Sequence, residues 1–175
     1  TPAVLQLLDS VVAQRCNVLV SGATSSGKTT FLAALAHRVP GGERFVVCED
    51  TAELDMRARH AVRLEARPAT SDGLVAIELV DLVRAALRLR PDRLIVGEFR
   101  GAEVLAAIQA MNTGHDGSLS TCHANSAADA LRRVETLVMQ AAPTWPLIAI
   151  RRQVSRSIDV VVHLERDAGG RRHEN

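Results

Sequence analysis

The sequence predicts an α/β fold in which a mainly parallel sheet is flanked by helices. Short apolar runs alternate with longer amphipathic segments along the chain, as strands alternate with helices in this fold class. Hydrophobic residues make up 47% of the 175 residues but aromatic residues only 2%, so the core must consist mainly of Leu, Val, Ile and Ala. Such a core suits a parallel sheet covered on both faces. A glycine-rich segment also joins the first apolar run to a helix.

Strands and helices are predicted in turn over the first part of the chain. Apolar residues recur at helical spacing over residues 3–13, which predicts the first helix. The apolar run 17–20 is the first strand, and the helix after it extends to about residue 39, where Pro-Gly-Gly interrupts the pattern. Residues 44–50 form an apolar strand that ends in two acids, and residues 62–66 are predicted to form a further strand.

The alternation continues over the second part of the chain. A loop at residues 67–73 is followed by the amphipathic helix 78–88, which stops before Pro91. The next elements are strand 93–98, helix 102–111, strand 118–123, and helices at about 127–140 and 147–156, which a Pro-Thr-Trp-Pro segment separates. The last clear strand is 158–164, and residues 167–175 are typical of a hairpin whose return strand has only begun.

Composition and charge argue against several classes of protein. Lys plus Arg number 21 against 20 Asp plus Glu, so we expect no general surface for nucleic acid or anionic membranes. Cys16, Cys48 and Cys122 form no C-x-x-C pair and indicate neither a zinc site nor a disulfide framework. We expect Cys48 and Cys122 to be buried thiols in a reducing cytoplasm. There is no signal peptide and no apolar run near about 18 residues, so we predict no membrane span.

The two ends of the sequence indicate a segment of a longer protein. Thr1-Pro2 opens directly onto a helix without an initiating Met, and the hairpin at residues 167–175 is incomplete. We therefore expect a single excised domain over residues 1–175, truncated at its C-terminal end.

Residues 22–29 match the pattern G-x4-G-K-T, the phosphate-binding loop (P-loop) of nucleoside triphosphatases. Gly22 and Gly27 allow the backbone to turn its N–H groups toward phosphate oxygens, and the helix that follows adds the positive end of its dipole. Lys28, the only lysine of the chain, can reach the β- and γ-phosphates, and the Thr29 hydroxyl can ligate Mg²⁺. The sequence therefore predicts that a nucleotide and Mg²⁺ bind at Gly22, Ala23, Thr24, Ser25, Ser26, Gly27, Lys28, Thr29 and Thr30.

Acidic residues and histidines follow other predicted strands. Ligands of open α/β sheets bind outside the carboxyl ends of the strands, where Glu49 and Glu98 are expected to lie. Hydrolysis of a γ-phosphate needs charge compensation and a group that orients or deprotonates the attacking water, and a carboxylate can serve in either role. His115 and His123 flank a predicted turn and could approach one face from two sides of a loop, where an imidazole could donate to a γ-phosphate or to an acid.

Four segments together resemble one family. Residues 21–30, 49–54, 90–101 and 114–125 resemble, in this order, the Walker A, Asp box, Walker B and His box of the type II/type IV secretion ATPases. In the Walker B segment Gly97-Glu98 stands in for the common Asp-Glu pair. Residues 64–68 and 111–118 are most similar to the tight-adherence (Flp) pilus branch, which is related to conjugation-type secretion ATPases.

The resemblance implies a RecA-like P-loop NTPase domain that works as a hexameric ATPase on the cytoplasmic face of the inner membrane. Hydrolysis would drive a membrane platform protein in pilus assembly or protein secretion, and no specific nucleic acid is expected. The roles implied by position are phosphate binding for Lys28, Mg²⁺ ligation for Thr29 and Glu98, activation of the attacking water for Glu49, and γ-phosphate sensing for His123 with support from His115.

Several questions stay open at the level of sequence. The family carries an N-terminal domain before this one, and that domain, which usually contributes arginines to ring closure, is absent here. The arginines Arg57, Arg59, Arg63 and Arg67 could reach a neighbouring subunit's nucleotide or be solvated surface. Trp145 is either a partner-facing anchor or the cover of a core edge. Alternative functions are a nucleic-acid-translocating RecA-like ATPase and a nucleotide-gated regulator without turnover.

Overall fold

The computed structural model describes residues 2–56, 58, 60–166 and 172–174. Its elements are α1 (Pro2–Ala13), β1 (Val18–Gly22), α2 (Lys28–Ala36), β2 (Phe45–Glu49), β3 (Ala61–Glu65), α3 (Leu79–Ala86), β4 (Arg93–Phe99), α4 (Glu103–Met111), β5 (Leu119–His123), α5 (Ala127–Ala141), α6 (Leu147–Ser157), β6 (Val160–Arg166) and β7 (Arg172–Glu174). Every helix and strand predicted from the sequence is present, with ends shifted by a few residues at most, and β7 is the expected return strand of the hairpin.

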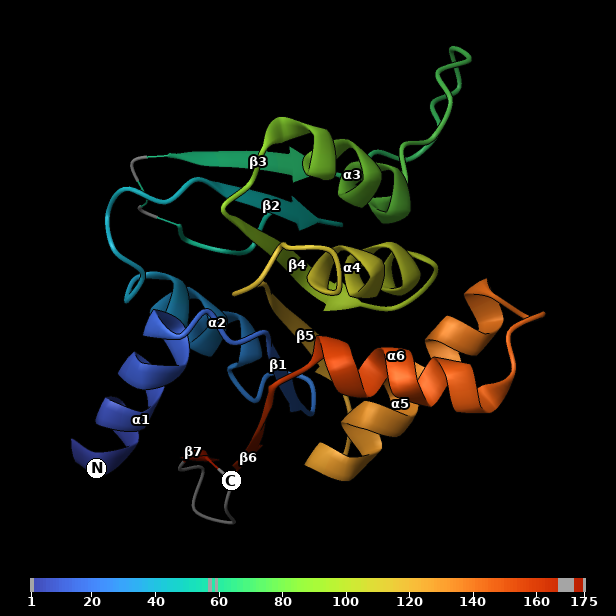
Figure 1. The fold of residues 1–175 in the computed structure, drawn as a ribbon. Helices are drawn as coiled ribbons and strands as arrows, with labels where there is room; N and C mark the ends of the chain where they lie inside the picture. Colours follow the sequence, from blue (N-terminus) through green and yellow to red (C-terminus); the bar gives the residue numbers. More distant parts are fainter. Residues whose placement is uncertain (1, 57, 59, 167–171, 175) are drawn as a thin grey trace.

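The strands form one sheet in the order β3-β2-β4-β5-β1-β6-β7 (Figure 1). All pairings are parallel except that of β7 with β6, which confirms the predicted mainly parallel α/β fold. The strand before the P-loop, β1, lies inside the sheet between β5 and β6, and every one of its residues is buried. Burial on both sides explains why β1 begins with three consecutive apolar residues, 18–20, rather than with an alternating pattern.

Helices cover both faces of this sheet (Figure 1). Helices α1 and α2 pack with one set of strand side chains, and α3, α4, α5 and α6 pack with the other set. Successive residues such as Leu19 and Val20 belong to different sides because side chains alternate across a strand. The P-loop follows β1, from which the chain continues to β2 on one side of β1, whereas β6 pairs with β1 on the other side. Ligands of open α/β sheets usually bind at such a change of direction in the strand order.

A buried ion pair holds the amino end of β4, on the side of the sheet away from the P-loop. The guanidinium of Arg93 is 1% exposed and donates to the two carboxylate oxygens of Glu43 at 2.8 and 3.2 Å. It also donates to the carbonyl oxygens of Val12 (2.9 Å) and Gly117 (3.4 Å). Residue 117 must be glycine here, because its φ is 81° and a Cβ would lie 2.5 Å from the guanidinium. This ion pair joins α1, the loop before β2 and the loop before β5.

Two residue predictions outside the site can be compared with the fold. The Trp145 ring packs against the core formed by α3, α4, α5 and α6, so it covers a core edge. Cys48 and Cys122 are buried free thiols as expected, and burial raises the pKa of each to about 12, which keeps both protonated. In the part of the chain that the structure describes, no helix combines the length and the apolar character needed to cross a bilayer.

Candidate functional site

The P-loop joins β1 to α2, and its backbone geometry favours glycine at two positions. Gly22 has a φ of 151°, and a Cβ there would lie 2.5 Å from the carbonyl oxygen of Leu164 and 2.6 Å from Oγ of Ser26. Gly27 has a φ of 99° and is the N-cap of α2, where no side chain caps the helix. The N–H groups at the start of α2 are therefore available to an anion, together with the positive end of the helix dipole.

The side chain of Lys28 is folded back onto the loop. Its Nζ donates to the carbonyl oxygens of Gly22 (3.0 Å) and Ala23 (2.9 Å), and the residue is 8% exposed. Burial lowers the pKa of Lys28. The ammonium is thus fixed beside the loop where the phosphates of a nucleotide are expected to bind.

Glu49, at the carboxyl end of β2, is buried and held in one orientation. Its Oε1 accepts the backbone N–H groups of Glu53 and Leu54, each at 3.0 Å. Gly97 lies beneath this side chain, and a Cβ on Gly97 would be 3.0 Å from Cγ of Glu49. The glycine of the Gly-Glu pair therefore leaves room for the neighbouring carboxylate.

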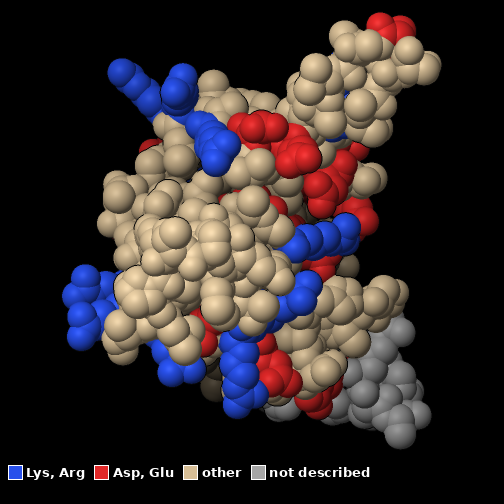
Figure 2. All heavy atoms as spheres, turned by 90° about the vertical axis from the view of Figure 1, so that its right-hand side faces the viewer, with Lys and Arg blue, Asp and Glu red and all other residues tan. Residues whose placement is uncertain are grey.

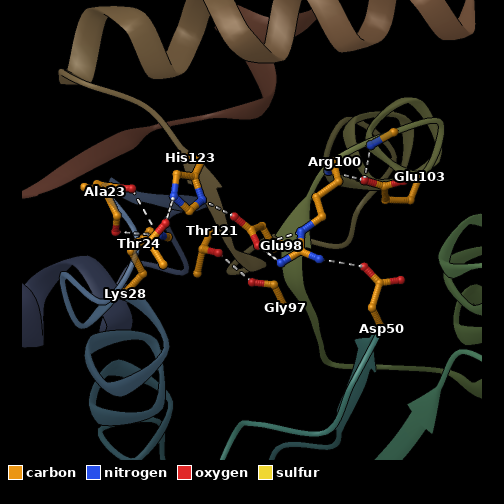
Figure 3. Close-up of polar contacts among 12 residues, drawn as sticks. Ala23, Thr24, Lys28, Asp50, Gly97, Glu98, Arg100, Glu103, Thr121 and His123 are labelled. Carbon is orange, nitrogen blue, oxygen red and sulfur yellow. Dashed lines mark hydrogen bonds and ion pairs between the residues drawn. The ribbon is translucent and has the colours of Figure 1, made fainter.

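Glu98, His123 and Thr24 form a continuous chain of hydrogen bonds across three strand ends (Figure 3). His123 Nδ1 lies 2.8 Å from Glu98 Oε1, and His123 Nε2 lies 2.8 Å from Thr24 Oγ1. The chain forms because β5 lies between β4 and β1, with His123 in register with Gly22. It links the carboxylate at the tip of β4 directly to the P-loop.

Arg100, which the sequence analysis did not single out, contacts the same carboxylate (Figure 3). Its Nε donates to Glu98 Oε2 at 2.7 Å, and its Nη1 lies 3.8 Å from Asp50 Oδ2. A signal was available in the sequence, because residues two apart in an extended strand point to the same side. Arg100 follows Glu98 by two positions, so the arginine was a candidate for the same site.

The charge of Glu98 is set by opposing effects. Burial raises the pKa of its carboxyl, but hydrogen bonds from His123 and Arg100 and the positive charges of Arg100 and Lys28 outweigh burial. The net result is a pKa below the ordinary value of 4.5, so Glu98 is ionised at neutral pH.

These groups line one cleft of about 460 Å³ at the carboxyl ends of the strands. Its lining residues are Thr24, Ser25, Gly27, Lys28, Thr29, Thr30, Glu49, Asp50, Thr51, Glu53, Gly97, Glu98, Arg100, Thr121 and His123. Of the predicted nucleotide-binding residues, Gly22, Ala23 and Ser26 form the loop itself without lining the cleft. Glu53 and Thr121 are further lining residues that the sequence analysis did not propose.

The oxygen donors of this cleft fit Mg²⁺ bound together with a nucleotide. The hydroxyl of Thr29 and the carboxylate of Glu98 are hard donors of the kind that Mg²⁺ prefers. Among the described residues no group of three or more His, Cys, Asp or Glu side chains could hold a metal ion alone. This donor set suits a cation that takes its remaining ligands from phosphates and water.

His115 does not reach the cleft. It lies in the loop before β5, where its carbonyl oxygen accepts the Ser118 hydroxyl, whereas His123 is the last residue of β5. The strand from Leu119 to His123, which is roughly 13 Å long at about 3.3 Å per residue, lies between this loop and His123. The expectation that both histidines approach one face is therefore wrong for this chain.

Two of the four arginines considered for a subunit interface make hydrogen bonds within the chain. Arg63 donates to the carbonyl oxygen of Met56 (2.9 Å), and Arg67 donates to that of Val75 (3.1 Å). Arg57 and Arg59 lie outside the described residues.

Comparison with known proteins points to one family. The family model described as "Type II/IV secretion system protein" matches residues 1–172. A putative conjugal transfer protein of Mycobacterium tuberculosis strain H37Rv is 43% identical over 171 residues, which are 98% of this chain and 48% of that protein. The chain thus spans about half the length of that relative.

Two solved structures share the fold. The VirB11 ATPase of the Brucella suis type IV secretion system, solved with sulphate, has a TM-score of 0.90 at 31% identity, over 99% of this chain and 51% of its own. The pilus retraction motor PilT, solved with bound ADP, has a TM-score of 0.74 at 26% identity, over 97% of this chain and 48% of its own. Both structures agree with the RecA-like fold. This chain therefore belongs to the type II/IV secretion system protein family.

Proposed function

We propose that this domain hydrolyses Mg²⁺-bound ATP and that hydrolysis powers protein secretion or pilus assembly. One observation carries the proposal: Lys28, at the start of α2, and Glu49 and Glu98, near the ends of β2 and β4, line a single cleft beside the P-loop. The composition of this cleft supports hydrolysis rather than binding alone, because it holds a fixed cation for phosphate and two carboxylates.

Each side chain has a role that its contacts support. Lys28 and the N–H groups at the start of α2 bind the phosphates. Glu49 orients and deprotonates the attacking water, and its backbone hydrogen bonds keep the carboxylate in place. Thr29 and Glu98 hold Mg²⁺, which supplies the positive charge that offsets charge developing on the phosphates. His123 connects Glu98 to the P-loop and senses whether a γ-phosphate is present.

We further propose that the domain acts within a hexameric ring at the cytoplasmic face of the inner membrane, on a membrane platform protein. The support is the family itself: one relative is named an ATPase of a type IV secretion system and another a pilus retraction motor. The isolated domain is expected to hydrolyse ATP slowly and to assemble poorly. Comparing turnover and solution mass of residues 1–175 with those of the full-length protein tests this, and equal activity with equal assembly would overturn it.

The charge distribution does not favour nucleic acid as the partner. Acidic and basic side chains are interspersed on the face shown in Figure 2, and much of that face is uncharged, which differs from the continuous basic surface that phosphate backbones require. We therefore expect turnover by the full-length protein to be unchanged by single- or double-stranded DNA. Stimulation by DNA would support a translocase instead, and nucleotide binding with no turnover would support a regulator.

A further inference from the structure

The cleft contains more negative than positive charge. Among its lining residues, four carboxylates (Glu49, Asp50, Glu53 and Glu98) face two permanent cations (Lys28 and Arg100). The ammonium of Lys28 is hydrogen-bonded to P-loop carbonyl oxygens and makes no direct contact with a carboxylate among the bonds of the described residues. Arg100 is thus the permanent cation that contacts the acids directly.

Both oxygens of the Glu98 carboxylate have partners. Oε1 is hydrogen-bonded to His123 at 2.8 Å, and Oε2 accepts Nε of Arg100 at 2.7 Å. A second nitrogen of the same guanidinium, Nη2, also pairs with Oε2. A metal ion that binds Oε2 of Glu98 therefore competes with Arg100 for this oxygen.

The Arg100 side chain is largely exposed, whereas its backbone is held by hydrogen bonds. Its backbone N–H, and that of Gly101, donate to Oε1 of the buried Glu103 at 2.5 and 2.7 Å. By contrast, the guanidinium side chain is 64% exposed. Arg100 and Asp50 also line a second cleft of about 430 Å³, together with Glu78 and Arg67. A guanidinium displaced from Glu98 thus has acidic neighbours, Asp50 and Glu78, within the adjoining space.

We propose that Arg100 is a positioning residue whose guanidinium pairs with Oε2 of Glu98, competes with a metal ion for that oxygen and so lowers the affinity of the cleft for free Mg²⁺. When Mg²⁺ binds together with nucleotide phosphates, whose negative charge would compensate that of the metal, the guanidinium of Arg100 would leave Glu98 and pair with Asp50, whose Oδ2 already lies 3.8 Å from Nη1. The consequence is selectivity for the metal–nucleotide complex over the metal alone. This inference rests on the proposed function of Glu98 as a Mg²⁺ ligand.

The test is a titration of the nucleotide-free full-length protein with Mn²⁺, in which electron paramagnetic resonance measures the free metal. Arg100→Gln removes one charge next to a divalent cation, so we expect its Kd for Mn²⁺ to be lower than that of the wild type by about tenfold, as Coulomb's law predicts for a contact of about 5 Å in water. Arg100→Lys keeps the charge and should bind Mn²⁺ like the wild type. The matched control Arg156→Gln removes an exposed arginine of α6 and should also leave the Kd unchanged.

A double variant locates the metal. The gain in Arg100→Gln must disappear when Glu98→Gln is added, because the competing oxygen is then gone. An unchanged or higher Kd in Arg100→Gln overturns the proposal, and so does a gain that survives in the double variant. Thermal unfolding of each variant confirms that it is folded. Since the titration needs no turnover, failure of this inference is distinguishable from failure of the proposed ATPase activity.

Discussion

His123 Nδ1 lies 2.8 Å from Oε1 of Glu98, which joins the last residue of β5 to the carboxylate at the end of β4. The other ring nitrogen, Nε2, lies 2.8 Å from the hydroxyl of Thr24 in the P-loop. The imidazole therefore connects the loop expected to bind phosphate directly to the carboxylate expected to organise Mg²⁺.

Replacing His123 should separate catalysis from nucleotide binding. In His123→Ala the P-loop backbone is untouched, so the Kd for ADP should change by less than about tenfold, the range for loss of one hydrogen bond. We expect kcat to fall by about 100-fold, as when one preorganised transition-state contact is removed. Steady-state kinetics and ADP titration measure the two effects. A wild-type kcat in this variant would show that the connection has no role in hydrolysis.

Gly97→Ala tests the position of Glu49. The added Cβ would lie 3.0 Å from Cγ of Glu49 and push this carboxylate out of place. We expect kcat to fall by about tenfold or more, since small displacements of a catalytic group are costly, with little change in nucleotide affinity. Gly41→Ala is the matched control, because a Cβ there meets nothing within 4 Å. Equal losses of kcat in both variants would count against a specific effect on Glu49.

The lowered pKa of Glu98 predicts how pH affects stability. A carboxyl with a depressed folded-state pKa stabilises the fold above its unfolded pKa, and the contribution is lost as pH falls through the folded value. Wild type should therefore be more stable than Glu98→Gln at pH 7, by about 0.5–1 kcal/mol for a partly exposed ion pair. The difference should shrink below the ordinary pKa of 4.5. Urea unfolding across pH measures it, and a difference that grows on acidification would contradict the assignment.

Arg93 should matter for stability and not for chemistry. Arg93→Met leaves Glu43 without its buried partner and should lower the free energy of unfolding by about 2–4 kcal/mol, somewhat less than for a fully buried pair. Arg156→Met, an exposed control, should change it by less than about 0.5 kcal/mol. Chemical denaturation compares them. Equal free energies of unfolding for the two variants would show that the Arg93–Glu43 pair does not stabilise the fold.

Much of the site could be predicted because its information is local. The P-loop functions through its backbone, which contiguous residues determine, so the segment 22–29 was sufficient to locate it. Glu49 and Glu98 follow continuous apolar runs, and the ends of buried parallel strands meet at one edge of the sheet. The predicted fold class and the family are confirmed by the sheet topology and by the family match.

Contacts between distant strands could not be predicted from the same patterns. The hydrogen bond between His123 and Thr24 exists only because β5 lies beside β1. The order of the strands along the sequence does not reveal that these two are neighbours in the sheet. His115 was expected at the same face as His123 for a related reason. Its loop lies at the amino end of β5, whereas His123 lies at the carboxyl end of this strand. Arg100 was not predicted, although the alternation of side chains along an extended strand places it on the same side as Glu98.

The most direct test of the proposed function is steady-state ATP hydrolysis with Mg²⁺ by the full-length wild type, Lys28→Ala and Glu49→Gln, with ATP affinity measured for all three. We predict that the wild type turns over, that Lys28→Ala loses ATP binding, and that Glu49→Gln binds ATP with kcat reduced by about 100-fold or more. A wild type that binds ATP but hydrolyses it no faster than Glu49→Gln would contradict the motor and leave a nucleotide-gated regulator.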